Sequence, residues 1–343
     1  MAQKIRVGVV GVGYLGRFHA QKYAAMDDVS LVGVVDTDLA RATLIAEETC
    51  TQAFTDYTAL AGKVDAVSIV TPTKYHFQVG RFFLENNIDV MMEKPITKTL
   101  EEADTLVALA EEKGCILQVG LLERFNPGFR AAEQRLSLPI FIEAKRLGTF
   151  NMRGTDVDVA LDLMIHDLDI ILSIIKSPVT SVCAVGAPVL TPLNDIINAH
   201  LIFANGCTAN ITASRVSNIV ERKMSIYQPG ECLTVDFGSR QCYSTQYIER
   251  ENEVFPYPQQ VKYVRSTPGD SIQLELLDFI RCVKERCQPT VTGSQGRESL
   301  AIALEVVAAV EKSNVTILEN LKKVGIHSLP SFLHALPKRE GSD

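Results

Sequence analysis

A glycine-rich turn near the start of the chain constrains its fold more than any other feature. The turn, Gly11-Val12-Gly13-Tyr14-Leu15-Gly16, directly follows the apolar run Ile5 to Val10. In a strand-turn-helix unit that binds a dinucleotide, the first glycine permits the tight turn, the second lets the backbone approach a pyrophosphate, and the third lets helix and strand pack closely. The phosphates would lie on the N–H groups of a helix that starts near Tyr14, where the helix dipole is positive. The pattern predicts nucleotide binding, and a turn without a ligand is the alternative.

A carboxylate stands where such a unit needs one for the ribose. Asp36 follows a second apolar run, Leu31 to Val35, and comes twenty residues after Gly16. A carboxylate at this position accepts hydrogen bonds from ribose hydroxyls and repels a 2′-phosphate, although Arg41 brings a positive charge close by. We therefore expect NAD as the cofactor, with NADP as the less favoured alternative.

The pattern of apolar runs changes near residue 120. Before it, short apolar runs alternate with amphipathic segments, as in a parallel sheet with helices on both faces. The clearest helix there is Leu100 to Lys113, with Gly114 as its C-terminal cap. The strands expected in this half are Arg6 to Val10, Leu31 to Val35, Ala66 to Val70, Val90 to Met92 and Ile116 to Val119.

Strand-like runs dominate the second half, and the turn Asn205-Gly206 between two of them is a strong hairpin signal. We expect a large, mostly antiparallel sheet, whose uncovered face would favour a homodimer or homotetramer. The expected strands are Ala199 to Ala204, Cys207 to Ala213, Lys223 to Tyr227, Leu233 to Phe237 and Gln260 to Val264, and the expected helices are Val157 to Ile175, Ser271 to Arg286 and Gly296 to Lys312.

The length supports two domains, because a single core stops growing at about 250 to 300 residues and this chain has 343. The predicted class is α/β. A Rossmann NAD-binding domain would span residues 1–121, an α+β domain for substrate binding and oligomerisation residues 122–330, and a C-terminal tail residues 331–343.

Composition and charge limit the classes of molecule that the protein is expected to bind. The net charge of −7 is spread along the chain, which leaves no basic stripe for nucleic acid or an anionic membrane. The sequence has neither a signal-peptide pattern nor an apolar stretch of about 18 residues, so we expect a soluble, cytoplasmic protein. The eight cysteines lie far apart without a Cys-x-x-Cys pair, which favours buried reduced thiols over disulfides or zinc ligands.

Two short motifs follow neighbouring strands of the predicted parallel sheet. Thr71-Pro72-Thr73 comes after Ala66 to Val70, at the carboxyl edge where open α/β sheets bind ligands. His76 belongs to that cofactor crevice or simply starts a helix. Glu93-Lys94-Pro95 follows the next strand, and Pro95 restrains the backbone of Lys94. Beside a nicotinamide ring, Lys94 can exchange a proton with a substrate hydroxyl, whereas most Lys-Pro pairs only end a strand.

A polar stripe interrupts the apolar helix predicted over Val157 to Ile175. Asp162 and His166 are four residues apart, and Asp169 lies one turn further on. In a catalytic role, Asp162 would orient the imidazole that takes a hydroxyl proton as hydride leaves the same carbon. A metal site formed with Asp169 is a less favoured reading, and a helix cap or a buried ion pair is the structural alternative. We expect no metal.

Further candidates lie between the two halves and shortly after. Arg124 and Asn126 could bind substrate oxygens or phosphate, or could form a turn shaped by the Asn-Pro pair. Arg146 and Arg153, on the segment that leads to the polar helix, are candidates for an anionic substrate group.

Together these motifs resemble the Gfo/Idh/MocA oxidoreductases, the family of glucose-fructose oxidoreductase and inositol dehydrogenase. The resemblance rests on the glycine-rich turn, Asp36, Thr71-Pro72, Glu93-Lys94-Pro95 and the helix with Asp162 and His166. It implies hydride transfer between a sugar or cyclitol carbon and nicotinamide, with Lys94, Asp162 and His166 as the catalytic set. Family members often have a cis peptide before the proline of this tripeptide. The chain departs from the family's usual glycine-rich approach to the catalytic aspartate, having Asp158-Val159-Ala160-Leu161 there.

Three stretches look most like the branch of the family that oxidises UDP-N-acetylglucosamine at C3, whose keto product feeds an aminotransferase for lipid A or surface polysaccharide. They are Glu123 to Pro127, Arg153 to Asp156 and Met164 to Asp169. In that branch Arg124, Arg146 and Arg153 would face the diphosphate, since a guanidinium fork suits phosphate. A free-sugar or inositol dehydrogenase is the alternative, and a non-enzymatic NAD-binding sensor is an alternative of another class.

Overall fold

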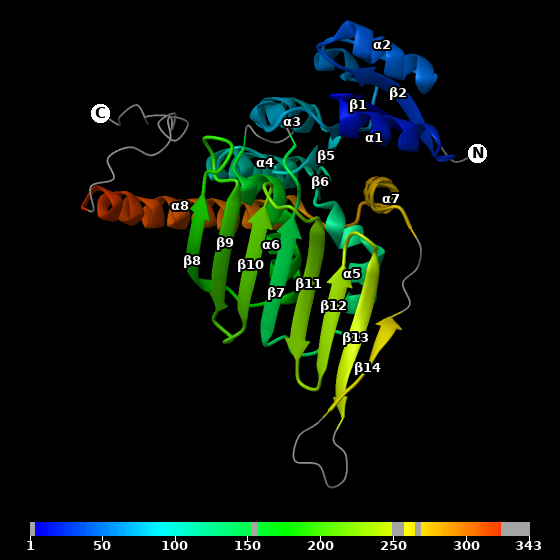
Figure 1. Ribbon diagram of the computed structural model, residues 1–343. Helices are drawn as coiled ribbons and strands as arrows, with labels where there is room; N and C mark the ends of the chain where they lie inside the picture. The colour runs from blue at the N-terminus through cyan, green and yellow to red at the C-terminus, as the bar shows by residue number, and fades with distance from the viewer. Residues whose placement is uncertain (1–3, 152–156, 249–256, 265–268, 324–343) are drawn as a thin grey trace. The chain divides into compact units, whose positions relative to one another are not determined.

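The computed structural model describes residues 4–151, 157–248, 257–264 and 269–323 (Figure 1). The chain divides into two compact units, residues 1–126 with 268–300, and residues 127–267 with 301–343. The predicted division into consecutive domains missed the return of residues 268–300 to the first unit. Its helix α7 (Ser271–Glu285) buries Leu276, Phe279 and Ile280 in a hydrophobic cluster with strands near the N-terminus. Burial of such a side chain contributes about 1.5 to 3 kcal/mol, which fixes the segment to this unit.

The first unit contains a six-stranded parallel sheet in the order β3-β2-β1-β4-β5-β6, so the predicted Rossmann class is confirmed. The three-residue strand β3 was not predicted, because it is too short to show a periodic pattern. The strands are β1 (Ile5–Val10), β2 (Val29–Val35), β3 (Gln52–Phe54), β4 (Ala66–Ile69), β5 (Asp89–Glu93) and β6 (Leu117–Gly120). The helices are α1 (Tyr14–Ala24), α2 (Leu39–Glu48), η1 (Tyr57–Leu60), η2 (Thr73–Tyr75), α3 (His76–Glu85), α4 (Leu100–Lys113), η3 (Leu122–Phe125) and α7.

Helix α4 has the bounds that the sequence predicts. Thr99 accepts a hydrogen bond from the N–H of Glu102, whose side chain returns the bond to the backbone of Thr99. This capping box satisfies N–H groups that a helix start otherwise leaves without partners. Gly114 ends the helix in the left-handed conformation, with φ of 64°.

Helices cover both faces of the parallel sheet. On one face, Tyr23 of α1 and Phe279 of α7 share a buried cluster with Val9 of β1. On the other, α3 approaches so closely that a Cβ on Gly80 would lie 2.6 Å from Met92 Cε of β5. The sheet is therefore buried on both sides, and its carboxyl edge carries the motifs considered below.

The second unit contains an eight-stranded sheet in the order β14-β13-β12-β11-β7-β10-β9-β8. Only β7 and β10 pair in parallel among these described strands, which confirms a mostly antiparallel sheet. The predicted hairpin is also present, with Gly206 at φ of 86°. Strands β7, β8 and β13 were not predicted. The strands are β7 (Phe141–Leu147), β8 (Val179–Ala187), β9 (Ile196–Phe203), β10 (Thr208–Ser214), β11 (Glu221–Gln228), β12 (Glu231–Asp236), β13 (Gln241–Ile248) and β14 (Tyr257–Val264).

Helices lie against one face of this sheet, and in the part of the chain that the structure describes no helix covers the opposite face (Figure 1). Along β9 the burial alternates, so that Ile197 and Leu201 face the helices while Ile196 and Ile202 are exposed. The helices are α5 (Pro127–Glu133), the π-helical segment η4 (Ala160–Met164), α6 (Ile165–Ile174) and α8 (Gly293–Lys323), whose first residues belong to the other unit.

All eight cysteines are free thiols, but the expectation that they are buried is only partly right. Cys50, which follows the end of helix α2, and Cys183, on strand β8, are exposed. Among the described residues, no helix has the length and apolar character needed to cross a bilayer.

Candidate functional site

At each of the three glycine positions of the N-terminal turn, a different feature of the structure accounts for the absence of a side chain. Gly11 has φ of 86°, and a Cβ there would lie 2.6 Å from the carbonyl oxygen of Val70. A Cβ on Gly16 would lie 1.9 Å from the carbonyl oxygen of Gly11. Gly13 is different, because no atom lies within 4 Å of its Cβ position and no side chain caps helix α1 there. Among the described residues, the backbone of Gly13 at the start of α1 is therefore open on its Cβ side, as the close approach of a pyrophosphate requires.

Asp36 is held at the end of β2 by the turn itself. Its Oδ2 accepts a hydrogen bond from the N–H of Val12 at 3.1 Å, and its Oδ1 accepts one from Asp38 at 3.0 Å. Arg41 lies 3.2 Å from Oδ1, and its side chain is 48% exposed. The carboxylate therefore stands where the ribose of a dinucleotide would lie.

Thr71-Pro72-Thr73 follows β4 and begins the short helix η2. His76, the first residue of α3, joins this loop to the next one, since its Nε2 lies 2.8 Å from the carbonyl oxygen of Thr71 and its Nδ1 lies 2.9 Å from that of Pro95. Burial lowers the pKa of His76 below its ordinary value, against the opposing effect of these two carbonyls. The buried hydroxyl of Thr71 has no hydrogen-bond partner among the described residues.

Lys94 follows the last residue of β5 and precedes a cis peptide bond to Pro95, as the family resemblance implies. The carboxylate of Glu93 accepts a hydrogen bond from the backbone N–H of Lys94 at 3.2 Å. Gly120 stands opposite Glu93 in β6, and a Cβ there would lie 2.9 Å from a carboxylate oxygen. A glycine at this position therefore makes room for Glu93.

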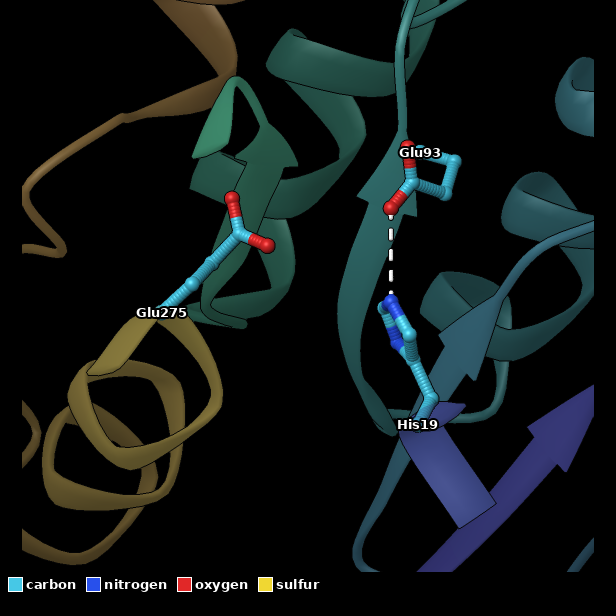
Figure 2. A group of neighbouring side chains, drawn as sticks. All are labelled: His19, Glu93 and Glu275. Carbon is cyan, nitrogen blue, oxygen red and sulfur yellow. Dashed lines mark ion pairs between the residues drawn. The ribbon is translucent and has the colours of Figure 1, made fainter. Parts of the chain in front are cut away.

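A buried group around Glu93 was missed by the sequence reasoning. His19 of α1, Glu93 of β5 and Glu275 of α7 each offer one ligand atom, and these atoms lie within 4.8 Å of one another (Figure 2). His19 Nε2 is 3.4 Å from a Glu93 oxygen, and its Nδ1 is 3.3 Å from the hydroxyl of Ser68. Such a group can hold a divalent cation or, without one, an imidazole between two carboxylates.

No group with metal-ligand spacing includes Asp162, His166 and Asp169 within the described ranges. The group of His19, Glu93 and Glu275 was missed because its members come from three elements that are distant in the sequence.

Asp162 and His166 lie on two kinds of helix. Asp162 is half-buried in the π-helical η4, and His166, 8% exposed, lies in the first turn of α6. The prediction that Asp162 and His166 share a face rested on an α-helix over the whole predicted segment. A π-helical turn shifts the hydrogen bonding by one residue and so rotates Asp162 relative to the face of α6, a feature that often accompanies functional sites.

Arg146, a predicted substrate contact, has a partner within its own unit. Its guanidinium makes two hydrogen bonds of 2.8 Å to the carboxylate of Asp167, and the two side chains are 4% and 1% exposed. A buried bidentate pair of this kind fixes α6 on β7. The Nε and Nη2 atoms of Arg146 already bind Asp167. This ion pair accounts for a buried arginine at position 146 better than a contact with a substrate phosphate does.

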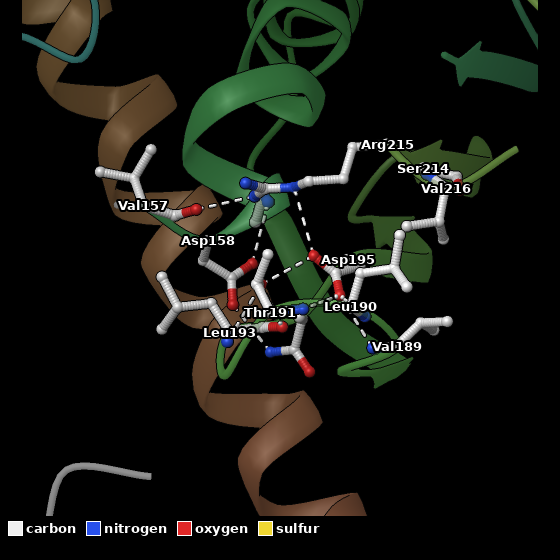
Figure 3. A network of polar contacts seen from close by, with 12 residues as sticks. Val157, Asp158, Val189, Leu190, Thr191, Leu193, Asp195, Ser214, Arg215 and Val216 are labelled. Atoms are coloured by element: carbon white, nitrogen blue, oxygen red, sulfur yellow. Dashed lines mark hydrogen bonds and ion pairs between the residues drawn. The ribbon is translucent and has the colours of Figure 1, made fainter. Parts of the chain in front are cut away.

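A second polar network holds the start of η4 (Figure 3). The carboxylate of Asp158 accepts hydrogen bonds from the N–H of Ala160 at 2.9 Å and from the side chain of Asn194 at 2.7 Å, and burial raises its pKa. Arg215 donates to the carbonyl oxygen of Val157 at 2.7 Å. The residues that replace the family's glycine-rich sequence thus include Asp158, whose carboxylate binds the N–H of Ala160, the first residue of the segment that carries Asp162.

The network continues at Asp195, which is 0% exposed. Arg215 Nε lies 3.7 Å from Asp195 Oδ1, and Thr191 donates through both its N–H and its hydroxyl at 2.8 Å. Burial raises the pKa of Asp195, but these and neighbouring hydrogen bonds together lower it below its ordinary value. Sequence reasoning missed Asp158, Asn194, Asp195 and Arg215 because single polar residues in loops carry no periodic signal.

The remaining candidates are differently placed. Arg124 is 6% exposed and donates to the carbonyl oxygen of Thr290 at 3.2 Å, while Asn126 donates to Glu123 at 2.9 Å. Their role in substrate binding stays a prediction. Arg153 lies outside the described residues.

Comparison with known proteins agrees with this geometry. Residues 5–121 match the model of an oxidoreductase family with an NAD-binding Rossmann fold, and residues 148–228 match the GFO/IDH/MocA C-terminal domain. The UDP-N-acetylglucosamine 3-dehydrogenase of Acidithiobacillus ferrooxidans is 37% identical, over 90% of this chain and 97% of that enzyme. The chain belongs to the Gfo/Idh/MocA family.

Solved structures extend the likeness. One of the Acidithiobacillus ferrooxidans enzyme matches with a TM-score of 0.84, covering 90% of this chain and 98% of that one. The inositol 2-dehydrogenase of Rhizobium meliloti is 25% identical over 91% of this chain and 99% of that enzyme.

As a Gfo/Idh/MocA member, the chain is an NAD-dependent oxidoreductase that acts on a CH–OH group. The residues present fit the cofactor, because Gly13 leaves an open cradle at the start of α1 and Asp36 stands at the ribose position. Family membership favours an enzyme over the alternative of a non-catalytic sensor.

Proposed function

We propose that this protein oxidises the C3 hydroxyl of UDP-N-acetylglucosamine with NAD. The observation that carries the proposal is the 37% identity to a UDP-N-acetylglucosamine 3-dehydrogenase over nearly the whole of both chains. Relatives that act on inositol share less sequence at comparable coverage, as the 25% identity of the Rhizobium meliloti enzyme illustrates. A nucleotide sugar is therefore the better substrate class.

The chemistry divides between cofactor and protein. NAD, when bound, supplies the nicotinamide C4 that accepts the hydride. Lys94 and His166 are the groups proposed to take the hydroxyl proton, since an amine or an imidazole of suitable pKa contributes about 10² to 10⁴ in rate. Asp162 is proposed to orient the imidazole of His166.

The backbone around Lys94 suits a positioned acid–base group. Its N–H is bound by the carboxylate of Glu93, which is 3.4 Å from His19 and would lie 2.9 Å from a Cβ at position 120. These contacts fix the backbone of Lys94. Its side chain therefore loses less conformational entropy when it binds a substrate hydroxyl.

Arginines are the proposed contacts of the diphosphate, because their planar fork binds phosphate oxygens in pairs. Arg124 and Arg153 are retained in this role, with Asn126 beside Arg124 as a contact of sugar oxygens. Arg146 is instead proposed to act through Asp167, by holding the helix that carries His166.

The uncovered face of the eight-stranded sheet supports assembly into a homodimer or homotetramer. Exposed apolar side chains gather on its strands, including Val185 at 55%, Ile202 at 38% and Tyr227 at 39%. A sheet face of this kind normally packs against another layer. Light scattering after gel filtration would give the mass, and a monomer at micromolar concentration would contradict this part of the proposal.

The pathway and compartment follow from the proposed substrate. A 3-keto nucleotide sugar is suited to an aminotransferase, which would give an amino sugar for lipid A or a surface polysaccharide. Both NAD and UDP-sugars are cytoplasmic metabolites, so the cytoplasm is the proposed compartment.

The experiment that tests the substrate follows reduced nicotinamide by its absorbance, with purified protein, NAD and UDP-N-acetylglucosamine. A parallel reaction with 2-oxoglutarate would reoxidise tightly bound cofactor and allow the 3-keto product to be detected by mass spectrometry. UDP-glucose, free N-acetylglucosamine and myo-inositol serve as comparison substrates. Turnover of UDP-N-acetylglucosamine alone is the expected result, whereas turnover of myo-inositol without a response to UDP-sugars would establish the inositol alternative.

A further inference from the structure

The end of helix α7 brings two thiols into contact. Cys282 lies in the last turn of the helix and Cys287 just beyond it, and their sulfur atoms are 3.6 Å apart. Between them, Arg286 adopts the left-handed conformation, with φ of 52°. This conformation turns the chain back on the helix, so that Cys287 comes to lie over Cys282.

The turn is anchored rather than loose. Arg286 donates to the carboxylate of Asp89 and to the carbonyl oxygen of Gly114, each at 2.6 Å. Asp89, whose side chain is 6% exposed, begins strand β5 of the parallel sheet. The turn between the two cysteines is therefore held at Arg286 by contacts with the parallel sheet, which keeps the two sulfur atoms close in the folded protein.

A guanidinium faces both sulfur atoms. Arg281 Nη1 lies 2.8 Å from the sulfur of Cys287, and its Nη2 lies 3.3 Å from that of Cys282. The carboxylate of Glu285, an ion-pair partner of Arg281, is 3.9 Å from Cys287. The guanidinium thus holds both sulfur atoms on one side of the helix end, and Glu285 holds the guanidinium in turn.

The two thiols differ in access. Cys287 is half-buried and lines a surface pocket of about 380 Å³, together with Cys115 and Arg286. Cys282 is 0% exposed and belongs to the hydrophobic cluster under the sheet. Burial and the bond from Cys287 raise the pKa of the Cys282 thiol to about 12. A reagent in solution would thus meet Cys287 first, with Cys282 directly behind it.

We propose that Cys282 and Cys287 are a redox modification site, at which a hydroperoxide converts the two thiols into an intramolecular disulfide. In the first step Cys287, as its thiolate, attacks the terminal peroxide oxygen, so that the O–O bond breaks, the sulfur is oxidised to sulfenic acid, and the alkoxide of the hydroperoxide leaves, which is hydroxide when hydrogen peroxide is the oxidant. In the second step Cys282 attacks that sulfur, the S–O bond breaks, and the hydroxyl leaves as water with the proton of the Cys282 thiol. A dithiol reductant reverses the reaction.

The pairing can be read directly by peptide mapping of the full chain. Reduced protein is exposed to hydrogen peroxide at neutral pH, its free thiols are blocked with N-ethylmaleimide in denaturant, and trypsin is added. Cleavage after Lys284 and Arg286 separates the two cysteines, so the disulfide would join the peptide 282–284 to the peptide 287–297. The expected result is this linked pair, a loss of 2 Da in the intact mass by removal of two hydrogen atoms, and recovery of both thiols with dithiothreitol.

Three variants separate this site from the other thiols. Cys287→Ser should leave Cys282 reduced after peroxide treatment, while Cys282→Ser should leave a sulfenic acid on Cys287 that dimedone traps. Cys115→Ser, which removes another thiol of the same pocket, is the matched control and should leave the linked pair intact. The proposal is overturned if wild-type Cys282 is fully blocked by N-ethylmaleimide after peroxide has consumed Cys287, or if Cys287 is linked to Cys115 instead.

Discussion

Asp36 Oδ2 accepts a hydrogen bond from the backbone N–H of Val12 at 3.1 Å, which ties the carboxylate at the end of β2 to the turn after β1. The two features on which the sequence prediction of a dinucleotide site rested are thus in direct contact. One carboxylate thus shapes the turn that is predicted to bind the phosphates, and the same carboxylate is the predicted contact of the ribose. Its second oxygen is bound by Asp38 and by Arg41, so the group has little freedom to move.

Asp36→Ala should therefore weaken NAD binding about tenfold to a hundredfold, the effect of removing a hydrogen bond to a charged group. NADP binding should fall less, because the carboxylate repels a 2′-phosphate and its removal relieves that repulsion. Both affinities can be measured by calorimetry. Glu47→Ala, which removes an exposed carboxylate from α2, is the matched control, and an equal loss of NAD and NADP affinity would contradict the assignment.

Lys94→Ala should lower the rate of the chemical step by about two to four orders of magnitude while NAD still binds, since it removes a general acid–base group and no predicted cofactor phosphate contact. Single-turnover absorbance of reduced nicotinamide measures this step. Lys98→Ala, an exposed lysine on the same loop, should keep the wild-type rate. Near-normal turnover in Lys94→Ala would remove the residue from its role.

The first unit was largely predictable because its signals are local. Apolar runs bounded by turn residues gave five of the strands of the parallel sheet, and the glycines of the turn after β1 gave the site. Helix α7 was also predicted, but its membership of the first unit was not. Phe279 and Ile280 pack on residues more than two hundred positions earlier, and such packing leaves no mark on the neighbouring sequence.

The second unit shows what a pattern of residue types cannot resolve. Arg146 lies in the buried row of β7, two residues after Ala144, so alternation along that strand would have placed it inward, facing Asp167. Because β7 was not predicted, the arginine was assigned to the substrate instead. The π-helical turn at Asp162 was equally out of reach, since it adds one residue to a turn without changing the apolar pattern.

His166→Ala should cut the chemical rate by about two to four orders of magnitude, on the proposal that its imidazole takes the hydroxyl proton. His200→Gln is the matched control, because His200 is a half-buried histidine of β9 bound to Asn210 and should have no part in catalysis. Stopped-flow absorbance with saturating NAD separates this effect from weaker cofactor binding. An unchanged single-turnover rate would exclude His166 as the base.

Gly120→Ala should disturb the position of Lys94 through Glu93. The new Cβ would lie 2.9 Å from the Glu93 carboxylate, which accepts the N–H of Lys94. We expect a loss of stability of about 1 to 3 kcal/mol, as for other overpacked sites, with a fall in kcat larger than any change in NAD affinity. Gly148→Ala is the matched control, since the nearest atom to its Cβ position is 4.0 Å away. Equal kcat in the two variants would contradict the link from Gly120 to Lys94.

His76 should make the stability of the first unit depend on pH. Each of its ring nitrogens lies within 2.9 Å of a carbonyl oxygen, from Thr71 and from Pro95, yet a neutral imidazole has one N–H and can donate to only one of them. Protonation would satisfy both carbonyls, but it places a charge on a side chain that is 1% exposed. Burial is the larger effect, and the pKa of His76 is lowered from 6.5.

The lowered pKa of His76 determines how the free energy of unfolding changes with pH. The native state binds the proton of His76 more weakly than the unfolded chain does, so the stability that depends on the neutral imidazole is fully present above about pH 6.5. It is lost as the pH falls from there through the lower pKa of the folded state. Urea unfolding at pH 7.5 and pH 5.5 should show a larger loss of unfolding free energy for the wild type than for His76→Gln, which cannot titrate. His200→Gln should keep the wild-type pH dependence, and a variant at position 76 that loses as much stability as the wild type would show that other groups cause the effect.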